Sequence, residues 1–134
     1  MKSLNGYALF TGLFFLLAFG IHVFMGGQEV LQFQPSSPAG HQNWLMKVGA
    51  FHLVTVDLLV LAAGLIFASL RFPKATVLYQ VVSGLCLLYA VSWLLQLALW
   101  HQSTQDFLML GQWVLFLIAA GGAWLASRKP RQHV

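Results

Sequence analysis

Four apolar runs, each about 20 residues long, limit what this chain can fold into. They cover about 5–25, 48–70, 75–99 and 107–126. A helix needs roughly 20 apolar residues to cross a hydrocarbon core about 30 Å thick. Because backbone groups in lipid must be hydrogen-bonded internally, each run is predicted to be a transmembrane helix. The short connections between the runs favour an all-α integral membrane protein, an antiparallel bundle of four transmembrane helices.

The composition agrees with this architecture. Of the 134 residues, 59% are hydrophobic and 7% are charged, whereas soluble domains carry about 25% charged residues. The four runs leave no room for a separate soluble domain, so residues 1–134 are predicted to form a single membrane domain. The net charge of +4 comes from basic residues beside the apolar runs. We therefore expect the lipid bilayer, and no nucleic acid, as a partner.

The basic residues also predict an orientation. In a four-span arrangement Lys47 lies alone on one side, and six basic residues lie on the other. Short basic flanks stay in the cytoplasm, so both termini are predicted to be cytoplasmic. The six residues are Lys2, Arg71, Lys74, Arg128, Lys129 and Arg131.

Two features of the connections and of the helix contacts can be predicted. The polar stretch 29–47 contains Pro35 and Pro38 with several turn-forming residues, which predicts a loop. Small residues spaced by four allow transmembrane helices to approach closely. Pairs with this spacing are Ala8/Gly12, Gly64/Ala68, Ala119/Ala123 and Gly122/Ala126.

Polar residues gather toward the predicted outer ends of the runs. Glu29 lies at the mouth of this region, and Asp57 lies deeper, about 13 Å below Val48 at 1.5 Å per residue. Polar and ionisable groups inside a membrane are energetically unfavourable, so such a cluster indicates a function. The sequence predicts an outward-facing polar pocket lined by His22, Glu29, His52, Thr55, Asp57, Gln96 and Gln112.

The glycine pair Gly26-Gly27 leaves the position of Glu29 open. If the first helix continues through the pair, His22 and Glu29 share a face and stand about 10 Å apart. If the pair breaks the helix, Glu29 folds back over the pocket, since glycine readily adopts the conformations of a reversal.

Two hypotheses give the pocket a cofactor. In the first, His22 and His52 are the axial ligands of a haem b held between the helices. In the second, His22, His52 and the carboxylate of Glu29 bind a transition metal such as iron, copper or zinc.

Two further hypotheses need no cofactor. In one, the protein is a non-enzymatic accessory subunit of a larger membrane complex, or a homo-oligomer, or it binds a lipid-soluble partner such as a quinone. The polar groups then form hydrogen bonds between helices. In the other, a proton-coupled carrier uses the embedded carboxylate of Asp57. The chain has no nucleophile elbow, phosphate-binding loop or dinucleotide fingerprint, and no catalytic residue is assigned.

Two short motifs suggest a family. His22 is followed by Gly26-Gly27-x-Glu29 at the end of the first run, and the second run contains Phe51-His52-Leu-Val-Thr55. With these motifs, the first half of the chain resembles small, uncharacterised bacterial four-helix inner-membrane proteins. The resemblance implies a multi-pass protein of the bacterial inner membrane. It marks His22, Glu29 and His52 for testing and implies no activity.

Overall fold

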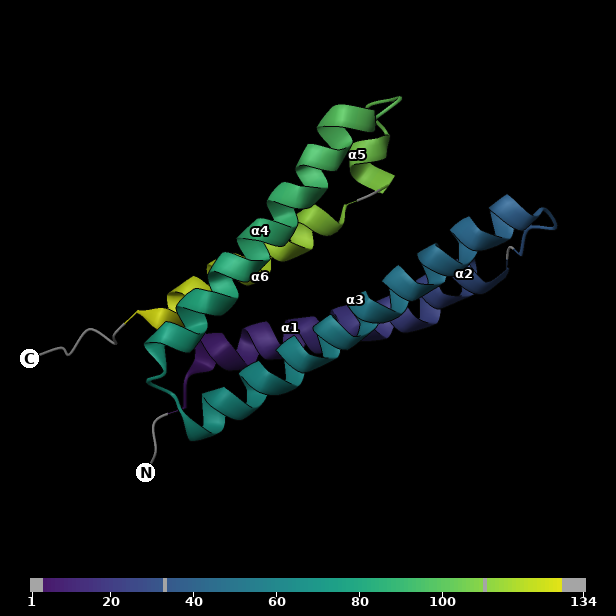
Figure 1. Ribbon diagram of the computed structural model, residues 1–134. Helices are drawn as coiled ribbons and strands as arrows, with labels where there is room; N and C mark the ends of the chain where they lie inside the picture. Colours follow the sequence, from purple (N-terminus) through teal and green to yellow (C-terminus); the bar gives the residue numbers. More distant parts are fainter. Residues whose placement is uncertain (1–3, 33, 110, 129–134) are drawn as a thin grey trace, which may run out of the picture.

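The computed structural model describes residues 4–32, 34–109 and 111–128, which form helices joined by short turns, with no β-strand among them. The all-α prediction is therefore confirmed for this part of the chain. In chain order the elements are α1 (Gly6–Ile21), the π-helical turn η1 (His22–Gly26), α2 (Gly27–Gln32), α3 (Pro38–Arg71), α4 (Thr76–Trp100), α5 (Asp106–Met109) and α6 (Gln112–Ser127) (Figure 1).

Among the described residues, three helical segments are long and apolar enough to cross a membrane. They are the continuous stretch Gly6–Gln32 with 27 residues, α3 with 34 and α4 with 25. Helix α6 has 16 residues and is about 24 Å long at 1.5 Å per residue, shorter than the hydrocarbon core. The short α5 precedes it, and Gly111 lies in the turn between them. The predicted fourth run is therefore divided into two helices.

Helix α3 starts well before the predicted span at residue 48, because residues 38–47 are already helical. The Ser37 hydroxyl caps the helix and accepts a hydrogen bond from the Gly40 N–H at 3.2 Å. Pro38 follows at the start of the helix, where a missing N–H breaks no hydrogen bond. The loop prediction was wrong for residues 38–47, since a proline directly after a serine can begin a helix instead of ending one. It was also wrong for residues 29–32, which belong to α2.

The helices are arranged as two hairpins. Helix α1 packs against α3, and α4 packs along α6, while a smaller contact between α1 and α6 joins the two pairs. Figure 1 shows the hairpins meeting where α1 begins and α6 ends, and separating toward the tips that carry α2 and α5. We call these the closed end and the open end of the molecule.

Two glycines allow the closest helix contacts. A Cβ atom added at Gly12 of α1 would lie 2.8 Å from Cγ1 of Ile66 and 2.9 Å from its backbone nitrogen in α3. Gly122 of α6 lies directly against the hydroxyl group of Thr11 in α1. The predicted packing role is confirmed for these two glycines. It was wrong for Gly64, where an added Cβ would have no neighbour within 4 Å among the described residues.

A single asparagine connects the helix ends at the closed end. The Asn5 side-chain amide donates to the carbonyl oxygens of Pro73 at 3.0 Å and Ala126 at 2.9 Å. Its side-chain oxygen accepts from the Ala8 N–H at 3.1 Å and so caps α1. Its backbone N–H donates to the carbonyl oxygen of Ser69 at 3.2 Å. Asn5 therefore links α1 with α3, with the α3–α4 turn and with α6.

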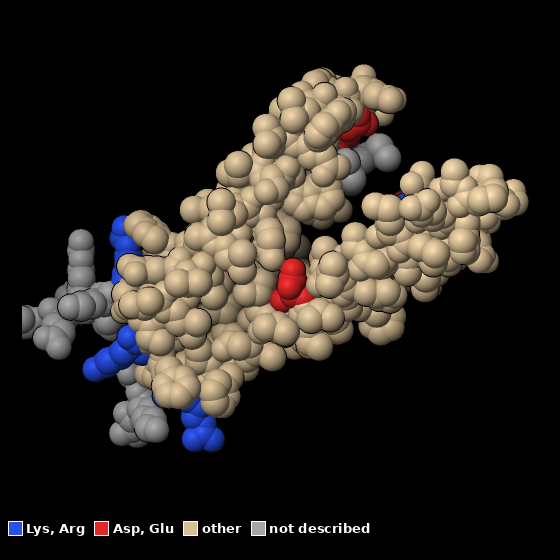
Figure 2. Space-filling model, viewed as in Figure 1, with Lys and Arg blue, Asp and Glu red and all other residues tan. Residues whose placement is uncertain are grey.

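Most of the described basic side chains lie at one end of the molecule. Figure 2 shows lysine and arginine side chains gathered at the closed end. Arg71 ends α3, Lys74 lies in the following turn, and Arg128 follows α6. Lys47 lies in the half of α3 toward the open end. The other basic residues used to predict the orientation, Lys2, Lys129 and Arg131, lie outside the described residues.

Candidate functional site

His22 is the first residue of the π-helical turn and packs against Phe51 of α3. The two rings are stacked, with centroids 4.1 Å apart and planes 16° from parallel. Gly26 makes room for the Phe51 ring, because an added Cβ would lie 3.2 Å from it, whereas a Cβ at Gly27 would lie at an ordinary contact distance of 3.7 Å. Single π-helical turns within α-helices occur frequently at functional sites. This turn makes His22, Phe51 and the glycine pair one packed unit.

A hydrogen bond fixes the orientation of the His22 ring. Nε2 lies 3.2 Å from the carbonyl oxygen of Phe51, and because a carbonyl can only accept, Nε2 carries the proton. The Thr55 hydroxyl donates to the same oxygen at 2.9 Å. The structure therefore brings His22 and Thr55 together at one backbone carbonyl.

His52 lies apart from this hydrogen bond. Its side chain is exposed, and its ring meets the edge of Phe51 with the planes 75° apart. Phe51 thus stacks on His22 with its face, while His52 lies at the outside of the pair. Within the described ranges, no group of three or more His, Cys, Asp or Glu side chains lies close enough to hold a metal ion. The haem and metal hypotheses stay predictions.

Replacing His22 by alanine removes the stacked ring and the hydrogen bond to Phe51. We expect the free energy of unfolding to fall by about 1–2 kcal/mol, since each contact contributes roughly 0.5–1.5 kcal/mol. The same change at the exposed His52 should stay within about 0.5 kcal/mol. Thermal unfolding of detergent-purified variants measures the difference, and His22→Phe separates the two contributions by keeping only the ring.

The same variants test the cofactor hypotheses. An absorption spectrum and elemental analysis of protein mildly solubilised from its native membrane would show a Soret band or a stoichiometric metal if a cofactor is bound. Loss of that signal in both His22→Ala and His52→Ala would contradict a purely structural His22 and support a pair of ligands.

Glu29 lies away from the His22–Phe51 unit, at the open end. The helix continues through Gly26-Gly27, so Glu29 is part of α2 and does not fold back. It lines a small groove of about 260 Å³ together with Trp44 and Lys47 of α3. The Trp44 indole N–H donates to the Val30 carbonyl at 3.0 Å, which ties the end of α2 to α3. This groove holds one acidic and one basic side chain.

Asp57 lies in the middle part of α3, away from both His22 and Glu29, and connects the two hairpins. The Tyr89 hydroxyl of α4 donates to its carboxylate at 3.1 Å. The Tyr89 ring in turn packs against Phe116 of α6, with centroids 5.1 Å apart. The Asp57 side chain itself is exposed. A carboxylate on α3 therefore reaches the second hairpin through one tyrosine.

Gln96 and Gln112 share helix faces with the two aromatic residues of this link. Gln96 follows Tyr89 by seven residues in α4, and Gln112 precedes Phe116 by four in α6, so each pair shares a helix face. Both glutamine side chains are exposed. The predicted pocket residues are thus distributed over the His22–Phe51 unit, the Glu29 groove and the space between the hairpins.

Asp106 is the first residue of α5, and the turn before the helix holds its carboxylate in the charged form. The backbone N–H groups of Gln102 and Ser103 donate to Asp106 at 2.7 Å and 3.2 Å. These two hydrogen bonds lower the pKa of Asp106 below its ordinary value. The open end therefore keeps a negative charge at neutral pH.

The sequence patterns missed three residues that organise these places. Asn5 has a detectable signal, because asparagine directly before an apolar run is a typical helix N-cap. Tyr89 has a weaker one, since a hydroxyl in the middle of an apolar run needs a hydrogen-bond partner. Phe51 entered only as part of the Phe51-His52 motif and received no role of its own, because an aromatic residue in an apolar run looks like any other packing residue.

The chain matches no protein-family model, no curated protein and no solved structure. Its function is therefore inferred from its own residues and their arrangement.

Proposed function

We propose that this chain is an integral membrane protein that acts as a non-enzymatic accessory subunit or binding module. The proposal rests on one observation: the two hairpins separate toward the open end, and the exposed carboxylate of Asp57 lies between them. The three long apolar helices support placement in a membrane.

Four spans and two cytoplasmic termini are part of this proposal. The spans lie within Gly6–Gln32, α3 and α4, and the fourth covers about residues 107–126. The basic residues at the closed end support an orientation with that end in the cytoplasm. The open end then faces the other side of a bacterial inner membrane.

The surface around Asp57 needs a partner in such a membrane. Asp57 precedes Arg71 by fourteen residues, which is about 21 Å along the helix and well inside the apolar layer. Leu53 and Val60 share its face of α3 and are 70% and 62% exposed. An aspartate near the centre of a spanning helix costs about 2.5–3.5 kcal/mol unless it is paired or hydrated.

The most suitable partner is a transmembrane helix that carries a hydrogen-bond donor. A carboxylate accepts up to about four hydrogen bonds, so the Tyr89 hydroxyl leaves capacity for a further donor. The apolar neighbours of Asp57 would pack against the same helix. Gln96 and Gln112 of the second hairpin would add polar contacts.

Replacing Asp57 by leucine should separate the protein from its partner. We expect at least a tenfold loss of the co-purifying membrane protein, because the acceptor in the interface is removed. Asp57→Asn should lose less, since an amide still accepts a hydrogen bond. The measurement is quantitative mass spectrometry of the tagged protein, extracted from its native membrane in mild detergent, with the mass of the complex from light scattering.

Two control variants isolate the effect of the carboxylate. Tyr89→Phe removes the internal donor and keeps the acceptor, so the partner should remain. Leu59→Ala changes a side chain that is 46% exposed and lies about 200° around α3 from Asp57. Equal partner recovery with aspartate and leucine at position 57 would contradict the proposal. Substrate uptake in proteoliposomes that Asp57→Asn abolishes would favour the carrier instead.

A further inference from the structure

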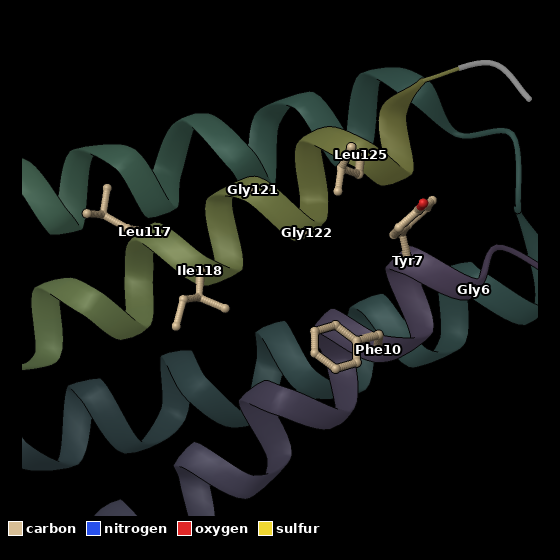
Figure 3. Close-up of a pocket in the computed structure, with 8 residues that line it drawn as sticks. All are labelled: Gly6, Tyr7, Phe10, Leu117, Ile118, Gly121, Gly122 and Leu125. Carbon is tan, nitrogen blue, oxygen red and sulfur yellow. The ribbon is translucent and has the colours of Figure 1, made fainter.

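A second groove lies between α1 and α6, where the two hairpins contact each other. It has a volume of about 700 Å³, within the usual range of ligand sites. Glycines line its wall on both helices, and Figure 3 shows Phe10 and Ile118 projecting into the space between them. Its full lining is Gly6, Tyr7, Phe10, Leu117, Ile118, Gly121, Gly122 and Leu125. Along α6 it extends from Leu117 to Leu125, about 12 Å.

One end of this groove opens beside the basic residues of the closed end. Gly6, at that end of the groove, adjoins Asn5, whose amide bonds the carbonyl oxygens of Pro73 and Ala126. Lys74 directly follows Pro73, and its side chain is exposed. An apolar channel therefore continues into a positively charged surface.

Arg128 directly follows α6, at the end of the helix where Leu125 lines the groove. It follows Leu125 by three residues, which is nearly one helical turn. Its guanidinium carbon lies 3.6 Å from the centre of the Trp124 ring, so the ring holds the charge at the end of the helix. No described residue forms a hydrogen bond with this guanidinium, whose edge can bind an anion through two parallel hydrogen bonds.

We propose that the α1–α6 groove binds an anionic phospholipid, with one acyl chain along the groove and the phosphate group at Arg128 and Lys74. The apolar lining matches the chain, and the two cations match the phosphate. This inference rests on the proposed placement in a membrane, with the closed end at the anionic cytoplasmic surface. It does not depend on the partner proposed for Asp57.

Filling the groove tests the site of the acyl chain. Gly121→Leu adds a side chain where a Cβ meets nothing within 4 Å, so the helices can keep their packing. Native mass spectrometry of detergent-purified protein, titrated with phosphatidylglycerol or with phosphatidylcholine of the same acyl chains, measures retention. We expect the unmodified chain to prefer phosphatidylglycerol at least tenfold and Gly121→Leu to lose at least tenfold in retention.

Two further variants complete the test. Gly84→Leu on α4 is the matched control, since an added Cβ there also meets open space and Gly84 does not line the groove. It should retain the lipid. Arg128→Gln combined with Lys74→Gln should remove the preference for phosphatidylglycerol and leave the weaker retention of phosphatidylcholine unchanged.

The outcomes separate this inference from the proposed function. Equal retention of both lipids by the unmodified chain, or undiminished retention by Gly121→Leu, overturns the lipid site. A change from dimer to monomer in Gly121→Leu without a change in lipid also overturns it and identifies a second copy as the occupant. Extraction of the protein from membranes by alkaline carbonate overturns the membrane placement itself.

Discussion

Replacing Gly12 by alanine is expected to lower the free energy of unfolding by about 1–3 kcal/mol, the range for overpacked cores. The added Cβ would lie 2.9 Å from the backbone nitrogen of Ile66 and 3.1 Å from the carbonyl oxygen of Ala62. Both atoms belong to the main chain of α3 and cannot turn away as a side chain can. Helix α1 therefore has to move away from α3, and the apolar contacts around it weaken.

The same helix supplies the control for Gly12. Gly20→Ala adds an identical methyl group where nothing lies within 4 Å, so it should be neutral or slightly stabilising through helix propensity. Thermal unfolding in a single detergent, followed by circular dichroism, compares the two variants. Equal melting temperatures for Gly12→Ala and Gly20→Ala would contradict the close approach of α1 and α3.

Replacing Asn5 by alanine is expected to cost about 2–4 kcal/mol and to loosen the closed end. The variant loses an N-cap, worth roughly 1 kcal/mol, and two hydrogen bonds worth roughly 0.5–1.5 kcal/mol each. The lost bonds are those to Pro73 and Ala126, which lie in the α3–α4 turn and in α6. The first hairpin is then held to the second with fewer polar contacts.

Asn5→Asp separates the contribution of the N-cap from that of the two donated hydrogen bonds. Aspartate still caps α1, but its carboxylate has no N–H to donate to either carbonyl. With one spin label on each hairpin at the open end, the distribution of distances between the labels should broaden in both variants. The loss of stability from the missing N-cap should appear only with alanine. A stability of Asn5→Asp equal to that of the unmodified chain would show that the two donated bonds contribute nothing.

Hydrophobic patterning predicted the helices better than their junctions. The run 75–99 became α4 almost unchanged, because a long apolar stretch without a proline has few alternatives. The start of α3 was missed because serine and proline are typical of turns, whereas in the structure Ser37 caps the helix and Pro38 is its first residue. The division of the fourth run occurs near Gly111, where an isolated glycine in an apolar stretch gives a weak signal.

The sequence could place the candidate residues by their depth along each helix, but it could not predict their contacts. Depth along each helix can be counted from the sequence, so His22, His52 and Gln96 were placed near one end. Rotation about each helix axis depends on which neighbours pack together. The π-helical turn at His22 adds to this difficulty, because it rotates the side chains that follow it about the helix axis. The separation of the hairpins has no local pattern, since it follows from contacts distant in sequence.

The hydrogen bond from Asn5 to Ala126 joins residues 121 positions apart. During synthesis, chains emerge at about 5–20 residues per second, so this bond can form only after Ala126 has been synthesised, several seconds after Asn5. A nascent or truncated chain has both partners of the first hairpin but no acceptor from the last helix. Closure of the basic end therefore requires α6, and a chain truncated before α6 would lack this bond between the two hairpins.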